Sequence, residues 1–96
     1  MNDLEIWFKV WFSPNGEDHT DPVIYKKDRW PVLPRIDEWY SFDKELGAQH
    51  VFGVTHQGRD RQGNAIIFVE FLLREPEFNE LRKKPGWTDK PPECVS

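Results

Sequence analysis

Cysteine is nearly absent from the chain, since Cys94 is the only one. A single cysteine cannot form a disulfide within the chain, which excludes the disulfide-stabilised domains common among secreted proteins of this size. The sequence also lacks the Cys-x-x-Cys and His-Glu-x-x-His spacings of zinc sites. His50 and His56 would lie about 20 Å apart along an extended strand, too far to share one ion. We therefore predict no metal site and no cofactor.

Long hydrophobic runs are absent as well. The longest, residues 65–69, is far shorter than the roughly 18 apolar residues that indicate a membrane-spanning helix. Residues 1–5 lack the positive and apolar stretches of a signal peptide. Together with the lack of disulfides, this leads us to expect a cytoplasmic protein that does not contact a membrane.

Catalytic motifs are missing too. No serine lies in a Gly-x-Ser-x-Gly turn, and no glycine-rich loop of the phosphate-binding kind occurs. His56, next to the polar loop 57–63, is the most plausible catalytic acid or base, although a histidine at the rim of the domain explains it more simply. We predict that the protein is not an enzyme and keep a small enzyme built around His56 as a third hypothesis.

Aromatic residues are what the sequence has in excess. Its 96 residues include five Trp, seven Phe and two Tyr, which is enough bulk to bury the core of one small domain. Along residues 4–12, apolar side chains fall on one face and Trp7 and Trp11 fall on the other, a pattern that predicts a strand. We expect residues 1–87 to form one compact domain and residues 88–96 to be a flexible, proline-containing tail.

Further strands and one helix are predicted from shorter patterns. The strands are expected at residues 23–27, 38–42, 49–56 and 64–74, the last two forming a hairpin. A short helix is expected at residues 75–84, because Pro76 suits its first turn and Phe78 and Leu81 share a side that can dock on the strands. About five strands in an open sheet would expose apolar edges, so we predict closure into a small antiparallel barrel. The alternative is an α+β antiparallel sheet with one helix.

The middle of the chain adds a resemblance to this prediction. Residues 32–40 read Val-Leu-Pro-Arg-Ile-Asp-Glu-Trp-Tyr, residues 50–56 read His-Val-Phe-Gly-Val-Thr-His, and the return strand of the hairpin follows. This order resembles small SH3-like barrels, in which a proline-containing segment turns a corner at a glycine before the next strand. Asp37 stands where that glycine is expected, and Asp tolerates a positive φ better than most residues. The resemblance covers residues 30–73 and implies an SH3-like barrel with a binding role, without indicating a ligand.

Tryptophan and proline support the first functional hypothesis, a non-enzymatic module that binds another protein. Tryptophan is enriched at binding hot spots, and an exposed Trp beside a Pro-x-x-Pro stretch is typical of recognition surfaces. The candidate partner-binding residues are Trp7, Trp11, Trp30, Pro31, Pro34 and Trp39. An inhibitor or immunity-type protein that covers a basic site is a special case, which the small size and net charge of -4 would suit. The alternative for Trp7 and Trp11 is a structural role under the C-terminal helix, against Phe78 and Leu81.

Charge is unevenly distributed and supports a second hypothesis, a nucleic-acid-binding barrel. Acidic residues dominate residues 1–21, whereas basic residues dominate residues 26–35 and 81–90. Basic side chains could neutralise phosphates while Trp30 stacks on a base; the candidates are Lys26, Lys27, Arg29, Arg59 and Arg61. The overall negative charge opposes this hypothesis, because phosphate neutralisation dominates non-specific affinity for nucleic acids.

Overall fold

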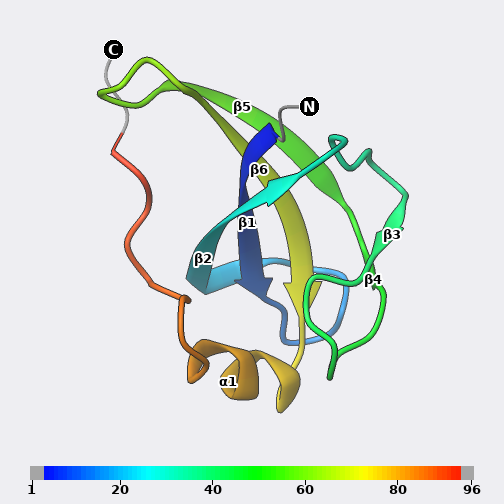
Figure 1. The fold of residues 1–96 in the computed structure, drawn as a ribbon. Coiled ribbons are helices and arrows are strands. Elements are labelled where there is room, and N and C mark those ends of the chain that lie inside the picture. Colours follow the sequence, from blue (N-terminus) through cyan, green and yellow to red (C-terminus); the bar gives the residue numbers. More distant parts are fainter. Residues whose placement is uncertain (1–3, 94–96) are drawn as a thin grey trace.

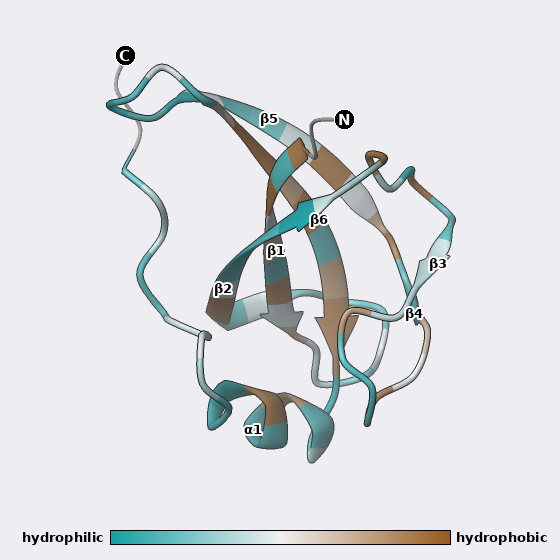
Figure 2. Ribbon diagram, viewed as in Figure 1, coloured by the Kyte–Doolittle hydropathy of each residue, from teal (hydrophilic) through white to brown (hydrophobic). Residues whose placement is uncertain are grey.

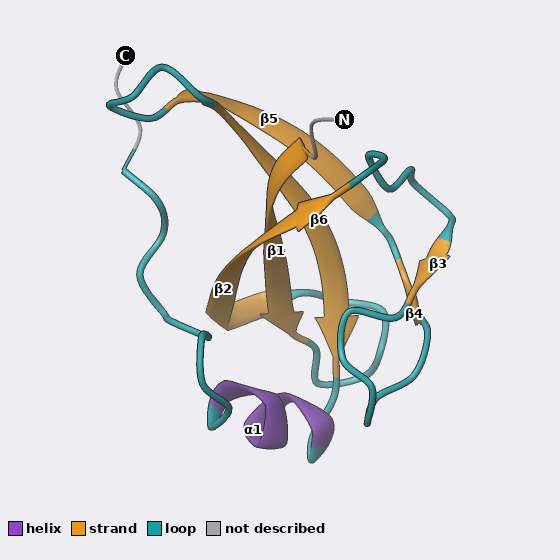
Figure 3. Cartoon of the chain, in the orientation of Figure 1, coloured by secondary structure: helices purple, strands orange, loops and turns teal. Residues whose placement is uncertain are grey.

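Six strands and one short helix make up the part of the chain that the computed structural model describes, residues 4–93 (Figures 1 and 3). They are β1 (Leu4–Phe12), β2 (Thr20–Trp30), β3 (Trp39–Tyr40), β4 (Gln49–His50), β5 (Gly53–Arg59), β6 (Ala65–Leu73) and α1 (Glu77–Arg82). Four strands form one sheet in the order β2-β1-β6-β5, and β3 pairs with β4 separately. No helix within residues 4–93 is long and apolar enough to cross a membrane.

The four-stranded sheet is mixed. β1 is antiparallel to β2 and parallel to β6, and the parallel register places Trp7 beside Phe68 and Phe12 beside Leu73. β5 is the antiparallel partner of β6 on its other side. The two outer strands, β2 and β5, do not pair with each other, so residues 4–93 form an open sheet.

The predicted closed antiparallel barrel is therefore wrong, although a mainly β chain with one short C-terminal helix is confirmed. Closure fails because β1 and β6 meet in parallel at the centre of the sheet, which leaves β2 and β5 on opposite edges. The edge of β2 is met instead by the tail: the Tyr25 N–H donates to the Thr88 carbonyl at 2.7 Å, and the Thr88 N–H donates to the Tyr25 carbonyl at 3.0 Å. The alternative prediction, an open sheet with one helix, is closer, but it too assumed antiparallel strands throughout.

The predicted strand bounds were most accurate where apolar side chains alternate in direction along a long stretch of sequence. The predicted strand at 4–12 is confirmed as β1, and the one at 64–74 is confirmed as β6 with one residue fewer at each end. The strand predicted at 23–27 extends over the whole of β2, because it follows β1 along its full length. The strand predicted at 38–42 is limited to the two residues of β3, and the helix predicted at 75–84 is limited to Glu77–Arg82.

The strand predicted at 49–56 is broken in two at Val51. The Val51 N–H donates to the Glu38 carbonyl, whereas the Phe52 N–H donates to the Glu70 carbonyl. The chain therefore leaves β3 and joins β6 between adjacent residues, and one predicted strand becomes β4 and β5.

The larger of two hydrophobic clusters lies on one face of the sheet, which we call the inner face; the smaller one, Tyr25, Ile66 and Phe68, lies on the opposite face. Ile6, Phe8 and Val10 of β1 are at most 1% exposed and pack with side chains from β6, α1 and the segment between β2 and β5; these include Val69, Phe71, Leu73, Phe78, Leu81 and Val51. The hydrophobic stretches of β1, β6 and α1 are visible in Figure 2. The ring of Phe8 contacts those of Trp30, Phe42 and Phe71 at centroid distances of 6.1, 5.4 and 6.0 Å. Burial of one such aromatic side chain contributes about 1.5–3 kcal/mol.

An ion pair fastens the segment between β3 and β4 to the end of α1. The Lys84 ammonium donates to both carboxylate oxygens of Asp43 at 2.9 Å and lies 3.3 Å from the Glu45 carboxylate. Burial of the Asp43 carboxyl raises its pKa, but the hydrogen bonds from Lys84 and from the backbone, together with the charge of Lys84, outweigh this and lower the pKa overall. The hydrogen bond to Asp43 is the main reason that the pKa of Lys84 is raised.

Replacement of Asp43 should change how stability depends on pH. Because the folded-state pKa of Asp43 lies below the ordinary value of 3.8, the ionised carboxylate stabilises the fold above that value, and this stabilisation is lost as the pH falls through the folded-state pKa. We expect Asp43→Asn to reduce the loss of unfolding free energy between about pH 5 and pH 2.5. Urea titrations across this range measure the effect. Glu45→Gln, which removes the more exposed partner of the same ammonium, is the control, and equal pH slopes for wild type and Asp43→Asn would contradict the assignment.

Candidate functional site

The face of the sheet opposite the core, which we call the outer face, carries Trp7, Lys9 and Trp11 from β1, Tyr25 from β2, and Phe68 and Glu70 from β6. The strand registers bring these residues together, because Lys9 stands beside Tyr25 on one side and beside Glu70 on the other. Tyr25 and Phe68 are buried, whereas the tryptophans and the two charged residues are half-buried. Charged groups and aromatic rings are thus combined here at partial burial.

Lys9 and Glu70 form the centre of the outer face. Their ammonium and carboxylate lie 3.9 Å apart, and their side chains are only 18% and 13% exposed. The Lys9 ammonium lies 4.7 Å from the ring centroid of Trp11 and 5.0 Å from that of Phe68, distances at which aromatic rings stabilise a cation. Lys9 is thus stabilised by both a carboxylate and aromatic faces.

The Glu70 carboxylate accepts hydrogen bonds on both oxygens. The indole N–H of Trp11 donates to Oε1 at 3.1 Å, and the hydroxyl of Thr55 donates to Oε2 at 2.7 Å. Burial raises the pKa of the Tyr25 hydroxyl, and the negative charges of Asp21 and Glu70 raise it further. A carboxylate engaged in this way holds strands together; it is not poised to take a proton from a substrate.

The remaining candidates for catalysis or metal binding are the histidines and the acidic side chains. His56 lies exposed on β5, and the alternation of the strand directs it to the side opposite Thr55. His19 instead packs its ring on Trp11 and Phe52, at centroid distances of 4.7 and 5.5 Å. Among residues 4–93, no group of three His, Cys, Asp or Glu side chains could hold a metal ion. Cys94 lies outside the described residues.

The structure separates the six predicted partner-binding residues into three environments. Trp7 and Trp11 lie half-buried on the outer face, while Phe78 and Leu81 belong to the core of the inner face, so packing of these tryptophans under the helix is ruled out. Pro34 is fully buried, and Trp30 packs edge-on against Phe8 and Tyr40. Pro31 and Trp39 are exposed.

Trp39 is one of three exposed apolar side chains in the segment 31–39, of which sequence reasoning found only this one. Val32, Ile36 and Trp39, which we call the loop patch, are 57%, 55% and 66% exposed. In residues 4–93 only one other large hydrophobic side chain, Leu4, is classed as exposed. A pocket of about 530 Å³ borders the loop patch and is lined by Val32, Leu33, Arg35, Glu38 and Tyr40. Val32 and Ile36 lie on either side of Pro34 in the sequence, and this position could have drawn attention to them. Pro34 is buried, whereas the side chains of Val32 and Ile36 are exposed.

The loop that carries the patch is held in one conformation. Asp37 has a φ of 72°, the left-handed conformation expected where the resemblance placed a glycine, and it is the only non-glycine residue in the described chain with a positive φ. Its N–H donates to the Val51 carbonyl at 2.8 Å, and its carboxylate lies 2.9 Å from His50 Nε2. The ring of Trp39 packs on the same His50 at 5.4 Å. The apolar side chains are therefore presented by a fixed backbone.

The five predicted nucleic-acid-binding residues are each engaged by a neighbour within the chain. Lys27 and Arg29 both pair with Glu5, at 3.3 and 2.9 Å, and Arg59 donates to a backbone carbonyl in its own hairpin. Lys26 lies against Trp87, with its ammonium 5.9 Å from the indole centroid, next to the core side of β2. Arg61 pairs with a carboxylate of the tail. Only Lys27 and Arg61 border the same pocket.

Comparison of the chain with protein-family models, with curated proteins and with solved structures gives no match.

The lack of a side chain at Gly53 should be essential to the outer face. A Cβ at this position would lie 2.8 Å from Glu70 Oε2, so Gly53→Ala must displace the carboxylate from its partners. We expect Gly53→Ala to lower the unfolding free energy by about 1–3 kcal/mol, the usual cost of overpacking. In a Glu70→Ala background the same change should cost much less, because the clashing atom is gone. Denaturant titrations of the four proteins measure the coupling, and an equal cost in both backgrounds would show that the contact with Glu70 is not the reason.

Proposed function

We propose that the chain is a non-enzymatic module that binds another protein through the loop patch. The observation that carries this proposal is that three of the four exposed large hydrophobic side chains in residues 4–93 belong to one nine-residue loop, 31–39. Scattered exposed apolar residues are normal on soluble proteins, whereas a local concentration of them is typical of interaction sites.

The identity and setting of Trp39 support the same function. Tryptophan is the residue type most enriched among those that dominate binding energy, and a side chain that is 66% exposed has most of its surface available to a partner. Because the positive φ of Asp37 and its contacts with Val51 and His50 fix the loop, little conformational entropy is lost on binding.

The chemistry of the partner follows from that of the loop patch. We expect a protein with an apolar cleft that receives Trp39 and Ile36. The net charge of -4 favours a partner with a basic rim, as for an inhibitor or immunity-type protein, because opposite charges speed association. A role in nucleic-acid binding has less support, since four of the five candidate cations already pair with a carboxylate or a backbone carbonyl.

Trp39→Ser combined with Ile36→Ser should abolish partner binding without unfolding the domain, because both side chains are exposed. The measurement is affinity capture from the source cell with wild type and variant, followed by titration of each retained partner. Leu4→Ser, which removes an exposed apolar side chain elsewhere, is the matched control and should retain the partner.

Two outcomes would contradict this proposal. One is a partner that binds wild type and the Trp39→Ser/Ile36→Ser variant equally well. The other is saturable binding of single-stranded DNA or RNA at about 50 mM salt that weakens when Lys27 or Arg29 is replaced, which would favour the nucleic-acid hypothesis instead.

A further inference from the structure

Residues 88–93 run along the sheet between two anchoring points. At one, Thr88 exchanges two backbone hydrogen bonds with Tyr25 at the edge of β2. At the other, the Glu93 carboxylate pairs with the Arg61 guanidinium at 3.0 Å, at the tip of the β5–β6 hairpin. Figure 1 shows this segment passing from α1 toward the hairpin tip.

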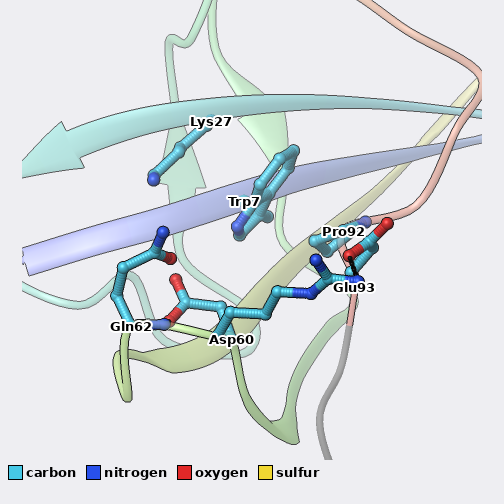
Figure 4. Close-up of a pocket in the computed structure, with 7 residues that line it drawn as sticks. Trp7, Lys27, Asp60, Gln62, Pro92 and Glu93 are labelled. Carbon is cyan, nitrogen blue, oxygen red and sulfur yellow. Dashed lines mark hydrogen bonds and ion pairs between the residues drawn. The ribbon is translucent and has the colours of Figure 1, made fainter.

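Near the second anchor the tail borders a pocket of about 290 Å³, which we call the Trp7 pocket. Its lining combines an aromatic ring, two cations, an amide and two residues of the tail itself: Trp7, Lys27, Arg61, Gln62, Pro92 and Glu93, together with Asp60 (Figure 4). The Asp60 carboxylate is committed to the hairpin turn, where it accepts the N–H groups of Gln62 and Asn64 at 3.0 and 2.9 Å. Besides Asp60, the lining offers the indole of Trp7, the amide of Gln62 and the cation of Arg61, which among the described residues pairs only with the tail, whereas Lys27 also pairs with Glu5.

The chemistry of this lining matches the tail segment that enters it. Proline-rich segments are extended before they bind and dock on aromatic side chains, which is the role open to Trp7. An acidic side chain next to the prolines finds Arg61, and Glu93 already occupies that position. Lys27, whose side chain is 47% exposed, adds a second positive charge at the border of the pocket.

The contact between the tail and the pocket is easily exchanged. The side chains of Arg61 and Glu93 are 74% and 72% exposed, and ion pairs this exposed contribute little to stability. The other anchor is a single bridge, whereas the strands of the sheet pair over six to nine positions. A segment of the same chemistry from another protein can therefore compete with the tail for the pocket.

We propose that the Trp7 pocket is part of a binding site for an extended acidic proline-containing segment of a partner protein, and that Pro92 and Glu93, which line the pocket from the tail, hold part of this site within the chain as a built-in competitor. This site is separate from the loop patch and does not rest on the function proposed above. The tethered tail has a high local concentration, so it lowers the apparent affinity for a partner segment until that segment displaces it.

The test uses a labelled, end-capped peptide that copies residues 88–93, Thr-Asp-Lys-Pro-Pro-Glu, and measures its fluorescence anisotropy. The full chain with Pro92→Gly and Glu93→Gln should bind the peptide saturably, because its own tail has lost a proline and the carboxylate that pairs with Arg61. Wild type should bind it about five- to tenfold more weakly, since the tail competes. Trp39→Ser should not alter peptide binding, which keeps this result independent of the loop patch.

A charge exchange provides the specific control. In the tail variant, Arg61→Glu should abolish binding of the peptide, and a peptide with Lys in place of its Glu should bind again. Arg61 is exposed at a hairpin tip, so its replacement should leave the unfolding midpoint unchanged. No saturable binding by the tail variant, binding that survives Arg61→Glu, equal affinities for wild type and tail variant, or displacement of the peptide by single-stranded DNA at lower concentration than by unlabelled peptide would each overturn the proposal.

Discussion

The parallel pairing of β1 with β6 is the constraint on which the rest of the structure depends. Two strands that run the same way need a long connection, and here everything between Phe12 and Ala65 serves as that connection. Within this connection, β2 pairs with β1 and β5 pairs with β6. β2 and β5 therefore become the edges of the sheet. The remaining segment, with β3 and β4, and α1 after β6 then cover one face, which becomes the core.

The same pairing determines what the uncovered face can contain. Lys9 and Glu70 are brought side by side, and a shift of either strand by one residue would direct them into the core and expose Phe8 and Val69 in their place. Their interaction with Trp11, Thr55 and Phe68 satisfies both charges only in the observed register. Half-buried ion pairs contribute modestly to stability, so we infer that the main role of this pair is to favour the observed register.

The sequence predicts a structural feature well when the residues that determine the feature are close together in the chain. The alternation of residues 4–12 and the docking side of the helix at Phe78 and Leu81 are decided within a few residues, and both were predicted. The parallel contact between β1 and β6 joins residues about 60 positions apart, and no local pattern distinguishes it from an antiparallel one. For the same reason, the loop patch was predicted only at Trp39: whether Trp30 and Pro34 are buried depends on Phe8 and the loops that cover it.

The distribution of satisfied and unsatisfied groups is what led us to propose binding rather than catalysis. A catalytic centre needs polar groups whose hydrogen bonds are completed by a substrate, yet the Glu70 oxygens already accept from Trp11 and Thr55. The loop patch is the reverse case, because its backbone is fixed by Asp37 and Val51 while its apolar side chains remain in water. Transfer of such side chains out of water is favourable at about 25 cal/mol per Å². Covering Val32, Ile36 and Trp39 with another surface would therefore be favourable, which is the physical basis of the proposed binding function.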